Sequence, residues 1–123
     1  MKKILVGLLI AFVAIPAGAA TKKVYTGVNR ILMSVGNEYG GCLIQPSKRI
    51  YTSGTTCPFK YISLDCANAT GSEGSSKADG QRRLDLALLA RLTSTELAFT
   101  INDARKVNGW CVADRVEMLP EAG

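Results

Sequence analysis

The sequence predicts a small, mainly β domain with one helix, in the order strand, strand, strand, helix, strand, strand. Two observations predict this class. A run of Leu and Ala from Gln81 to about Ser94 has helical spacing, and it interrupts segments rich in Val, Ile, Tyr and Thr that are bounded by Gly, Asn and Pro. The chain has 123 residues and no internal repeat, which leaves no room for a second domain beside this one.

Residues 1–20 have the features of a bacterial signal peptide. Lys2 and Lys3 form a positive start, and the apolar segment from Ile4 to Ile15 is too short for a comfortable membrane span. Ala17-Gly18-Ala19 matches the small-residue cleavage pattern. We therefore expect export to the periplasm or secretion beyond it.

Cleavage after Ala19 or Ala20 leaves residues 21–123 as one domain without a membrane span. Loss of the two signal lysines reduces the 15 basic side chains to 13, against 10 acidic ones, for a net charge of about +3. The basic pairs are scattered along the chain instead of clustering with aromatic residues. The sequence therefore predicts no nucleic-acid interface.

Four cysteines lie in the exported part of the chain: Cys42, Cys57, Cys66 and Cys111. An even number of cysteines in a small exported domain indicates two disulfides. The sequence has no His and no pair of Cys at the two-residue spacing that zinc sites usually have. We therefore expect no metal and no cofactor.

The apolar patterns and their boundaries predict five strands. They are Val24–Val35 with a bend at Gly27, Tyr39–Gln45, Phe59–Cys66, Glu96–Ile101, and a last strand that opens with Gly109-Trp110-Cys111 and ends at Met118. Between them, Pro46–Pro58 is a long loop, and Asn102–Asn108 is expected to form a charged hairpin tip.

The third strand alternates apolar and polar residues, which suggests how it pairs with the second strand. An antiparallel register with Ile44 opposite Leu64 brings two cysteines face to face. We favour disulfides between Cys42 and Cys66 and between Cys57 and Cys111, and the other two connectivities stay open.

The helix has a readable start and an unusual surface. Ser76 and Asp79 stand three residues apart, as in a capping box, and Asp79 is an alternative N-cap by itself. Apolar residues form two stripes instead of the usual one: Leu84, Ala87, Leu88 and Leu92, then Leu86, Leu89 and Ala90. Either the helix is buried on nearly all sides, or the second stripe meets a neighbouring subunit. The limited buried fraction of a small domain favours self-association.

This order of elements in about 100 residues is that of a five-stranded OB-like Greek-key barrel, β-β-β-α-β-β. The segments 59–66, 96–101 and 109–116, with the helix between the first two, resemble those of small secreted proteins of Gram-negative bacteria. Their layout is similar to that of the pentameric B subunits of bacterial A/B toxins, including the subtilase-cytotoxin type. The resemblance implies a ring whose helices line a central channel, and a disulfide between the second and third strands. It carries over no sugar-binding residue.

The sequence contains no evident catalytic set. The absence of His excludes Ser-His-Asp and Cys-His arrangements, and no Ser is followed three residues later by Lys. Paired carboxylates would have to come from Asp65, Asp103 or Asp114, which the sequence does not place together. We therefore predict that the protein is not an enzyme.

The remaining class is an exported binding module, an oligomeric subunit that binds a glycan or a protein. Trp110, Tyr39, Tyr51 and Tyr61 are candidates for stacking on a sugar, although packing in the core or at its rim is the commoner role of such residues. The alternative is a periplasmic inhibitor or structural protein that acts on a protein partner through a loop such as Pro46–Pro58.

Overall fold

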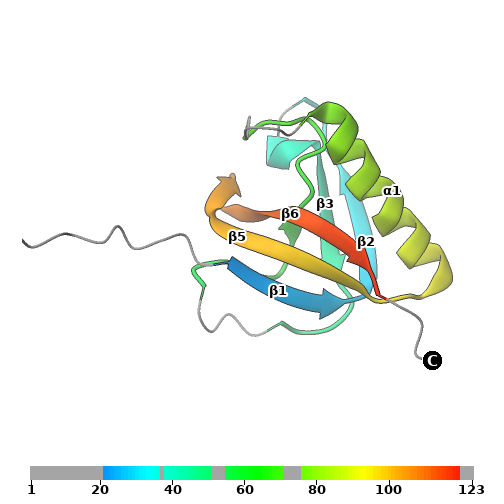
Figure 1. The fold of residues 1–123 in the computed structure, drawn as a ribbon. Coiled ribbons are helices and arrows are strands. Elements are labelled where there is room, and N and C mark those ends of the chain that lie inside the picture. The colour runs from blue at the N-terminus through cyan, green and yellow to red at the C-terminus, as the bar shows by residue number, and fades with distance from the viewer. Residues whose placement is uncertain (1–20, 37, 51–54, 71–75, 120–123) are drawn as a thin grey trace, which may run out of the picture.

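The computed structural model describes residues 21–36, 38–50, 55–70 and 76–119. Residues 1–20, which we predicted to be a signal peptide, lie outside these residues. Within them, the predicted class is confirmed: the protein is mainly β with one helix (Figure 1). The elements are β1 (Thr21–Thr26), β2 (Val28–Met33), the 3-10 turn η1 (Glu38–Gly41), β3 (Cys42–Pro46), β4 (Ile62–Ser63), α1 (Lys77–Thr93), β5 (Leu97–Val107) and β6 (Trp110–Met118).

The described strands form one open, six-stranded sheet in the order β1-β5-β6-β4-β3-β2. The predicted closed barrel of five strands is therefore wrong. The reason is Gly27, which divides the predicted strand Val24–Val35 into two. β1 pairs antiparallel with β5, whereas β2 pairs antiparallel with β3, so two strands that are consecutive in the chain form opposite edges of the sheet.

Gly27 is held against the start of the loop that follows β3. Its carbonyl accepts a hydrogen bond from the Ser47 backbone N–H at 3.0 Å. A Cβ at position 27 would lie 2.7 Å from the Ser47 hydroxyl oxygen, so a larger residue would require the Ser47 side chain to rotate. The bend at Gly27 that the sequence indicates is thus a break between two strands.

The second and third strands are shorter than predicted. The chain is still turning at Tyr39 and Gly40, which have φ of 54° and 75°, so β3 begins at Cys42 instead of Tyr39. β4 keeps only two residues of the predicted Phe59–Cys66. Ile44 pairs with Ile62, two residues away from the predicted partner Leu64.

The hairpin of β5 and β6 is longer than predicted. β5 continues to Val107, through the segment Asn102–Asn108 that was expected to be a charged tip. The turn is Asn108-Gly109, where φ is 49° and 86°. Asn-Gly with positive φ at both positions is the favoured two-residue turn between antiparallel strands. The pairing shifts between Asn102 and Lys106, so the residues between them bulge out of the ladder.

Helix α1 begins four residues before the predicted start at Gln81. Ser76 is the N-cap: its hydroxyl accepts from the Asp79 backbone N–H, and the Asp79 carboxylate accepts from the Ser76 N–H at 2.9 Å. This is the capping box that the sequence predicts. The helix ends at Thr93, and Ser94 closes it in the left-handed conformation with φ of 52°.

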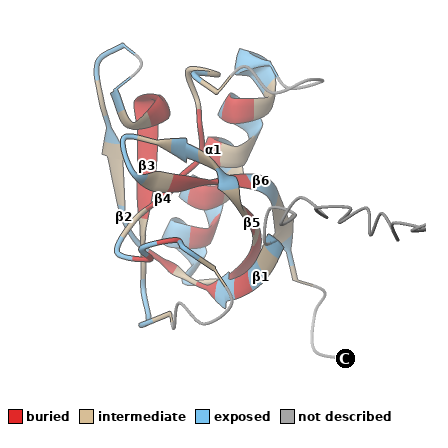
Figure 2. Cartoon of the chain, turned by 90° about the vertical axis from the view of Figure 1, so that its left-hand side faces the viewer, coloured by how far each residue is buried: buried red, intermediate tan, exposed pale blue. Residues whose placement is uncertain are grey.

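The core lies between the inner face of α1 and the sheet, as the buried positions in Figure 2 show. The largest fully buried apolar side chains are Phe99, Ile44, Ile62, Leu64, Leu97, Ile101 and Val112. α1 contributes Leu84, Ala87 and Ala90, and it also buries Gly80 in its first turns. The small residues let the helix approach the chain closely.

Gly80 marks the closest approach. A Cβ at this position would lie 2.6 Å from the Cys66 Cα and 2.7 Å from the Asp65 carbonyl oxygen. Backbone atoms cannot move aside as the end of a flexible side chain can. The segment Asp65–Cys66 therefore lies against a helix position that only glycine fits.

We predict that Gly80→Ala destabilises the protein although Ala favours helix. Helix propensity would stabilise it by about 1 kcal/mol, whereas overpacking against the backbone costs about 1–3 kcal/mol. Urea denaturation of the oxidised protein measures the sum. Gln81→Ala, at an exposed position of the same helix, is the matched control and should change stability by less than about 0.5 kcal/mol. A net gain in Gly80→Ala would contradict the close approach.

Candidate functional site

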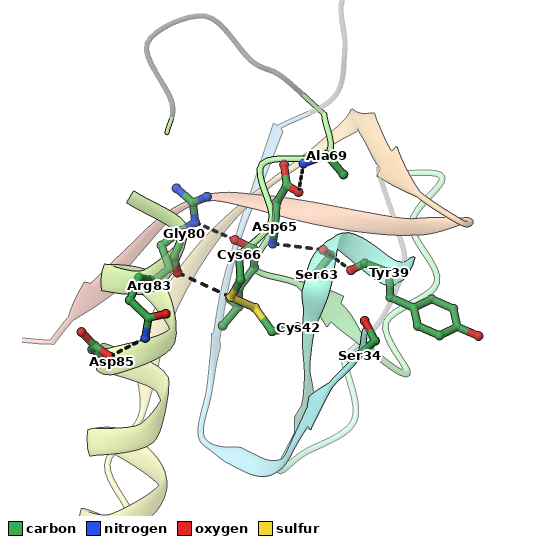
Figure 3. Close-up of a disulfide and its surroundings, with 12 residues drawn as sticks. Ser34, Tyr39, Cys42, Ser63, Asp65, Cys66, Ala69, Gly80, Arg83 and Asp85 are labelled. Carbon is green, nitrogen blue, oxygen red and sulfur yellow. Dashed lines mark hydrogen bonds between the residues drawn. A yellow bond between two sulfur atoms is a disulfide. The ribbon is translucent and has the colours of Figure 1, made fainter. Parts of the chain in front are cut away.

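Two disulfides connect the elements around the core, and Figure 3 shows the one between Cys42 and Cys66. Cys42 at the start of β3 bonds Cys66, and Cys57 bonds Cys111 near the start of β6, each with 5.7 Å between Cα atoms. This is the pairing that we favoured from the sequence. Cys66 lies beyond the end of β4, so the first disulfide joins β3 to the chain after the strand and not to a residue opposite in the ladder.

The buried side chain of Asp65 is the centre of a charged network next to this disulfide. Asp65 is fully buried and has a positive φ of 48°. Its carboxylate accepts hydrogen bonds from the backbone N–H of Ala69 at 2.7 Å and of Thr70 at 3.2 Å, and from the Thr70 hydroxyl. Asp65 therefore folds the segment 66–70 back over itself.

Arg105 connects Asp65 to Asp114. One guanidinium nitrogen lies 3.8 Å from the Asp65 carboxylate and donates to the Thr70 hydroxyl at 2.7 Å, and the other forms an ion pair with Asp114. Arg105 comes from the bulge in β5, which is what turns its side chain out of the ladder and towards Asp65. The structure thus brings together two of the three carboxylates that the sequence could not place.

Arg83 of α1 lies beside the same network. Its Nε donates to the Leu64 carbonyl oxygen at 2.9 Å, which ties the helix to the chain just before Asp65 (Figure 3). Burial lowers the pKa of Arg83, and the Asp65 and Asp79 carboxylates oppose this shift. Burial also lowers the pKa of Arg105, again opposed by Asp65. Both guanidinium groups are therefore partly desolvated cations that depend on Asp65.

These contacts give Asp65 a structural role. Asp65 has no exposed surface from which to reach a substrate, and it holds two backbone N–H groups. Asp103, the third carboxylate, lies elsewhere and is 3.4 Å from the Thr56 backbone N–H. Arg83, Arg105 and Thr70 were not candidates from sequence, because their contacts join segments that are far apart in the chain.

The candidate aromatic residues divide into different places. Tyr61 and Trp110 form an edge-to-face pair, with ring centroids 5.1 Å apart, and both are half-buried. Tyr39 lies in η1, where its carbonyl accepts from the Ser63 hydroxyl at 2.9 Å. Tyr51 lies outside the described residues. Two of the four aromatic candidates, Tyr61 and Trp110, therefore pack against each other at the rim of the core.

The outer face of α1 is apolar and uncovered. Leu88, Leu89 and Leu92 are exposed by 43%, 46% and 81% of their surfaces. Leu88 and Leu89 each lie about one turn before Leu92, so the three side chains adjoin near the C-terminal end of the helix, and Leu88 borders the buried Leu84. Within a single chain, this finding excludes the alternative in which the helix is buried on nearly all sides.

Comparison with protein-family models, with curated proteins and with solved structures found no match to this chain. Among the residues that the structure describes, no helix is both long and apolar enough to cross a membrane. The same residues contain no group of three or more His, Cys, Asp or Glu placed to hold a metal ion. The three exposed leucines of α1 are therefore the surface feature that indicates an interaction.

We predict that Asp65→Asn destabilises the protein by about 3 kcal/mol, because it leaves two partly buried guanidinium groups without their shared carboxylate. Asp114→Asn should cost about 1 kcal/mol or less, since its carboxylate is partly exposed and screened by water. Urea denaturation of both variants measures the difference. Equal losses would mean that Asp65 is no more important to the network than a surface charge.

Proposed function

We propose that the protein is an exported, non-enzymatic binding module that works as a homo-oligomer. The observation that carries this proposal is the outer face of α1, with Leu88, Leu89 and Leu92 exposed together. Single exposed apolar residues are common on proteins, but a contiguous apolar stripe usually marks an interaction surface. A second copy of the same chain is the partner that supplies an equal and complementary stripe.

Neighbouring features support self-association. β2 packs beside α1, and it is an edge strand of the sheet, with Met33 exposed at its end. Arg91 of α1 donates to the Asn29 carbonyl oxygen of β2 at 3.0 Å, and the other backbone groups of an edge strand can form hydrogen bonds with another chain. A second copy that pairs with this edge would lie next to the exposed leucines. This combination provides both directional and apolar contacts for one interface.

The strand arrangement supports the OB-like part of the proposal. The helix lies between β4 and β5, β4 runs parallel to β6, and the two edge strands are consecutive across Gly27. We propose that this is an OB-like Greek key left open at the break between β1 and β2. The likeness to pentameric toxin B subunits is part of the same proposal.

Two further features favour an exported, non-catalytic role. Two disulfides suit an oxidising compartment such as the periplasm. Asp65 and Asp114, which would be needed as paired catalytic carboxylates, both bind Arg105. The groups that remain at the surface suit recognition of a glycan or a protein better than bond cleavage.

We predict that the mature, oxidised protein has the native mass of two or more chains. The resemblance to toxin B subunits implies five. Multi-angle light scattering measures it. Changing Leu89 and Leu92 to Ser together should convert the assembly to single chains, because it removes the two most exposed leucines of the stripe.

The matched control changes Tyr25 and Met118 to Ser. They are exposed by 47% and 43%, close to the 46% of Leu89, and they lie on β1 and β6 and not on α1. This control should leave the native mass unchanged, and circular dichroism should show that both variants are folded. A single-chain mass for the unchanged protein at high concentration would refute the oligomer.

A further inference from the structure

The two disulfides differ in how far the fold covers them. Cys57 and Cys111 are both 1% exposed and Cys42 is fully buried, whereas Cys66 is only half-buried. A thiolate opens a disulfide by attacking one of its two sulfur atoms, so access to a sulfur decides which bond can exchange. Cys66 gives one disulfide an approach from solvent that the other lacks.

Cys66 lies in the turn after β4, beside the first turns of α1. Its Sγ is 3.6 Å from the Gly80 carbonyl oxygen (Figure 3). The sulfur of a disulfide has no hydrogen to donate, but the S–H of a reduced Cys66 would have this oxygen within reach as an acceptor. A disulfide whose reduced form is stabilised is easier to reduce. The position of Cys66 therefore favours opening of its bond.

The two segments that this disulfide joins are also held together by backbone hydrogen bonds on both sides of Cys66. The Leu64 N–H donates to the Cys42 carbonyl oxygen at 3.2 Å, and the Ala67 N–H donates to the Gly40 carbonyl oxygen at 2.8 Å. These bonds do not depend on the disulfide. The two thiols should therefore stay close together after reduction, in a position to close the bond again.

The Cys57–Cys111 bond is in a different situation. The segment 55–61, which contains Cys57, forms no strand, and Thr56 makes exposed hydrogen bonds with side chains of β5. The disulfide joins this segment to β6 across 54 residues of sequence. Both of its cysteines are covered, so it has the position of a structural bond.

We propose that Cys42–Cys66 is an exchangeable disulfide, which an external dithiol opens on the folded protein, and that Cys57–Cys111 is not. A thiolate of the dithiol attacks the Cys66 Sγ, the bond to Cys42 breaks, and the Cys42 Sγ leaves with the electron pair and takes a proton. The second thiolate of the dithiol then attacks the first dithiol sulfur in the mixed disulfide and releases Cys66, which takes the other proton.

Two electrons thus pass from the dithiol, which becomes a disulfide, to the cysteine pair. This inference makes Cys66 a site of covalent modification. It goes beyond the proposed binding function and does not rest on it.

The test treats the mature, oxidised protein with a low concentration of dithiothreitol, without denaturant, followed by iodoacetamide and mass mapping of the peptides. Cys42 and Cys66 should be labelled at least about tenfold faster than Cys57 and Cys111, and the circular dichroism should stay that of the folded protein. The buried pair is the internal control. The same treatment in urea should label both pairs at similar rates, because unfolding removes the difference in access.

Glutathione identifies the sulfur that is attacked, since a monothiol has no second thiol to release the mixed disulfide. A short exposure should leave glutathione on Cys66 and a free thiol on Cys42. Equal labelling of the two pairs in the folded protein, no labelling of either, glutathione mainly on Cys42, or loss of the folded circular dichroism signal on reduction would each overturn the proposal. The labelling pattern does not depend on the native mass, so this inference and the proposed oligomer are tested separately.

Discussion

The close approach of α1 to the segment Leu64–Cys66 is the constraint on which the rest of this structure depends. Gly80 permits the approach, since any side chain there would meet the Cys66 backbone. The Cys42–Cys66 disulfide fixes the same segment to β3, and Arg83 bonds its Leu64 carbonyl from the helix. A helix, an inner strand and a loop are thereby joined at three consecutive residues. The inner face of α1 is determined at this point, and the three exposed leucines follow from the helix rotation that it imposes.

The same segment explains why an acidic residue is buried. Ala69 and Thr70, in the turn after β4, lie outside any helix or strand, so their backbone N–H groups need other acceptors. The Asp65 carboxylate supplies them, and its charge in turn requires a cation, which the bulge in β5 provides as Arg105. A bulge that disrupts one ladder therefore completes the hydrogen bonding of a distant turn. Burial of this charge is explained by the backbone that it satisfies, without any need for catalysis.

Local patterns predicted the helix, its capping box and the mainly β class, because each depends on residues close in sequence or on periodicity. The favoured cysteine pairing is confirmed although the register that suggested it is shifted, since Ile44 pairs with Ile62 and not with Leu64. The Asn108-Gly109 turn was also present as a local signal, and the charged residues before it obscured it. Gly27 was visible in the sequence as a bend, but the separation of β1 and β2 onto opposite edges of the sheet was not, because it depends on their pairing with β5 and β3. The short β4 had no comparable signal. The same limit applies to the network around Asp65, since Thr70, Arg83 and Arg105 come from separate segments that only the fold brings together.

The fold separates the parts that provide stability from the surface proposed for self-association. Gly80 lies in the first turns of α1, and the exposed Leu92 lies near its other end. Twelve residues at 1.5 Å each separate these positions by roughly 18 Å. Residues separated by more than about 10 Å and without shared partners usually act independently on stability. A change at Leu92 should therefore leave the Asp65 network intact, so a loss of assembly there reports on the exposed leucines and not on the folding of the domain.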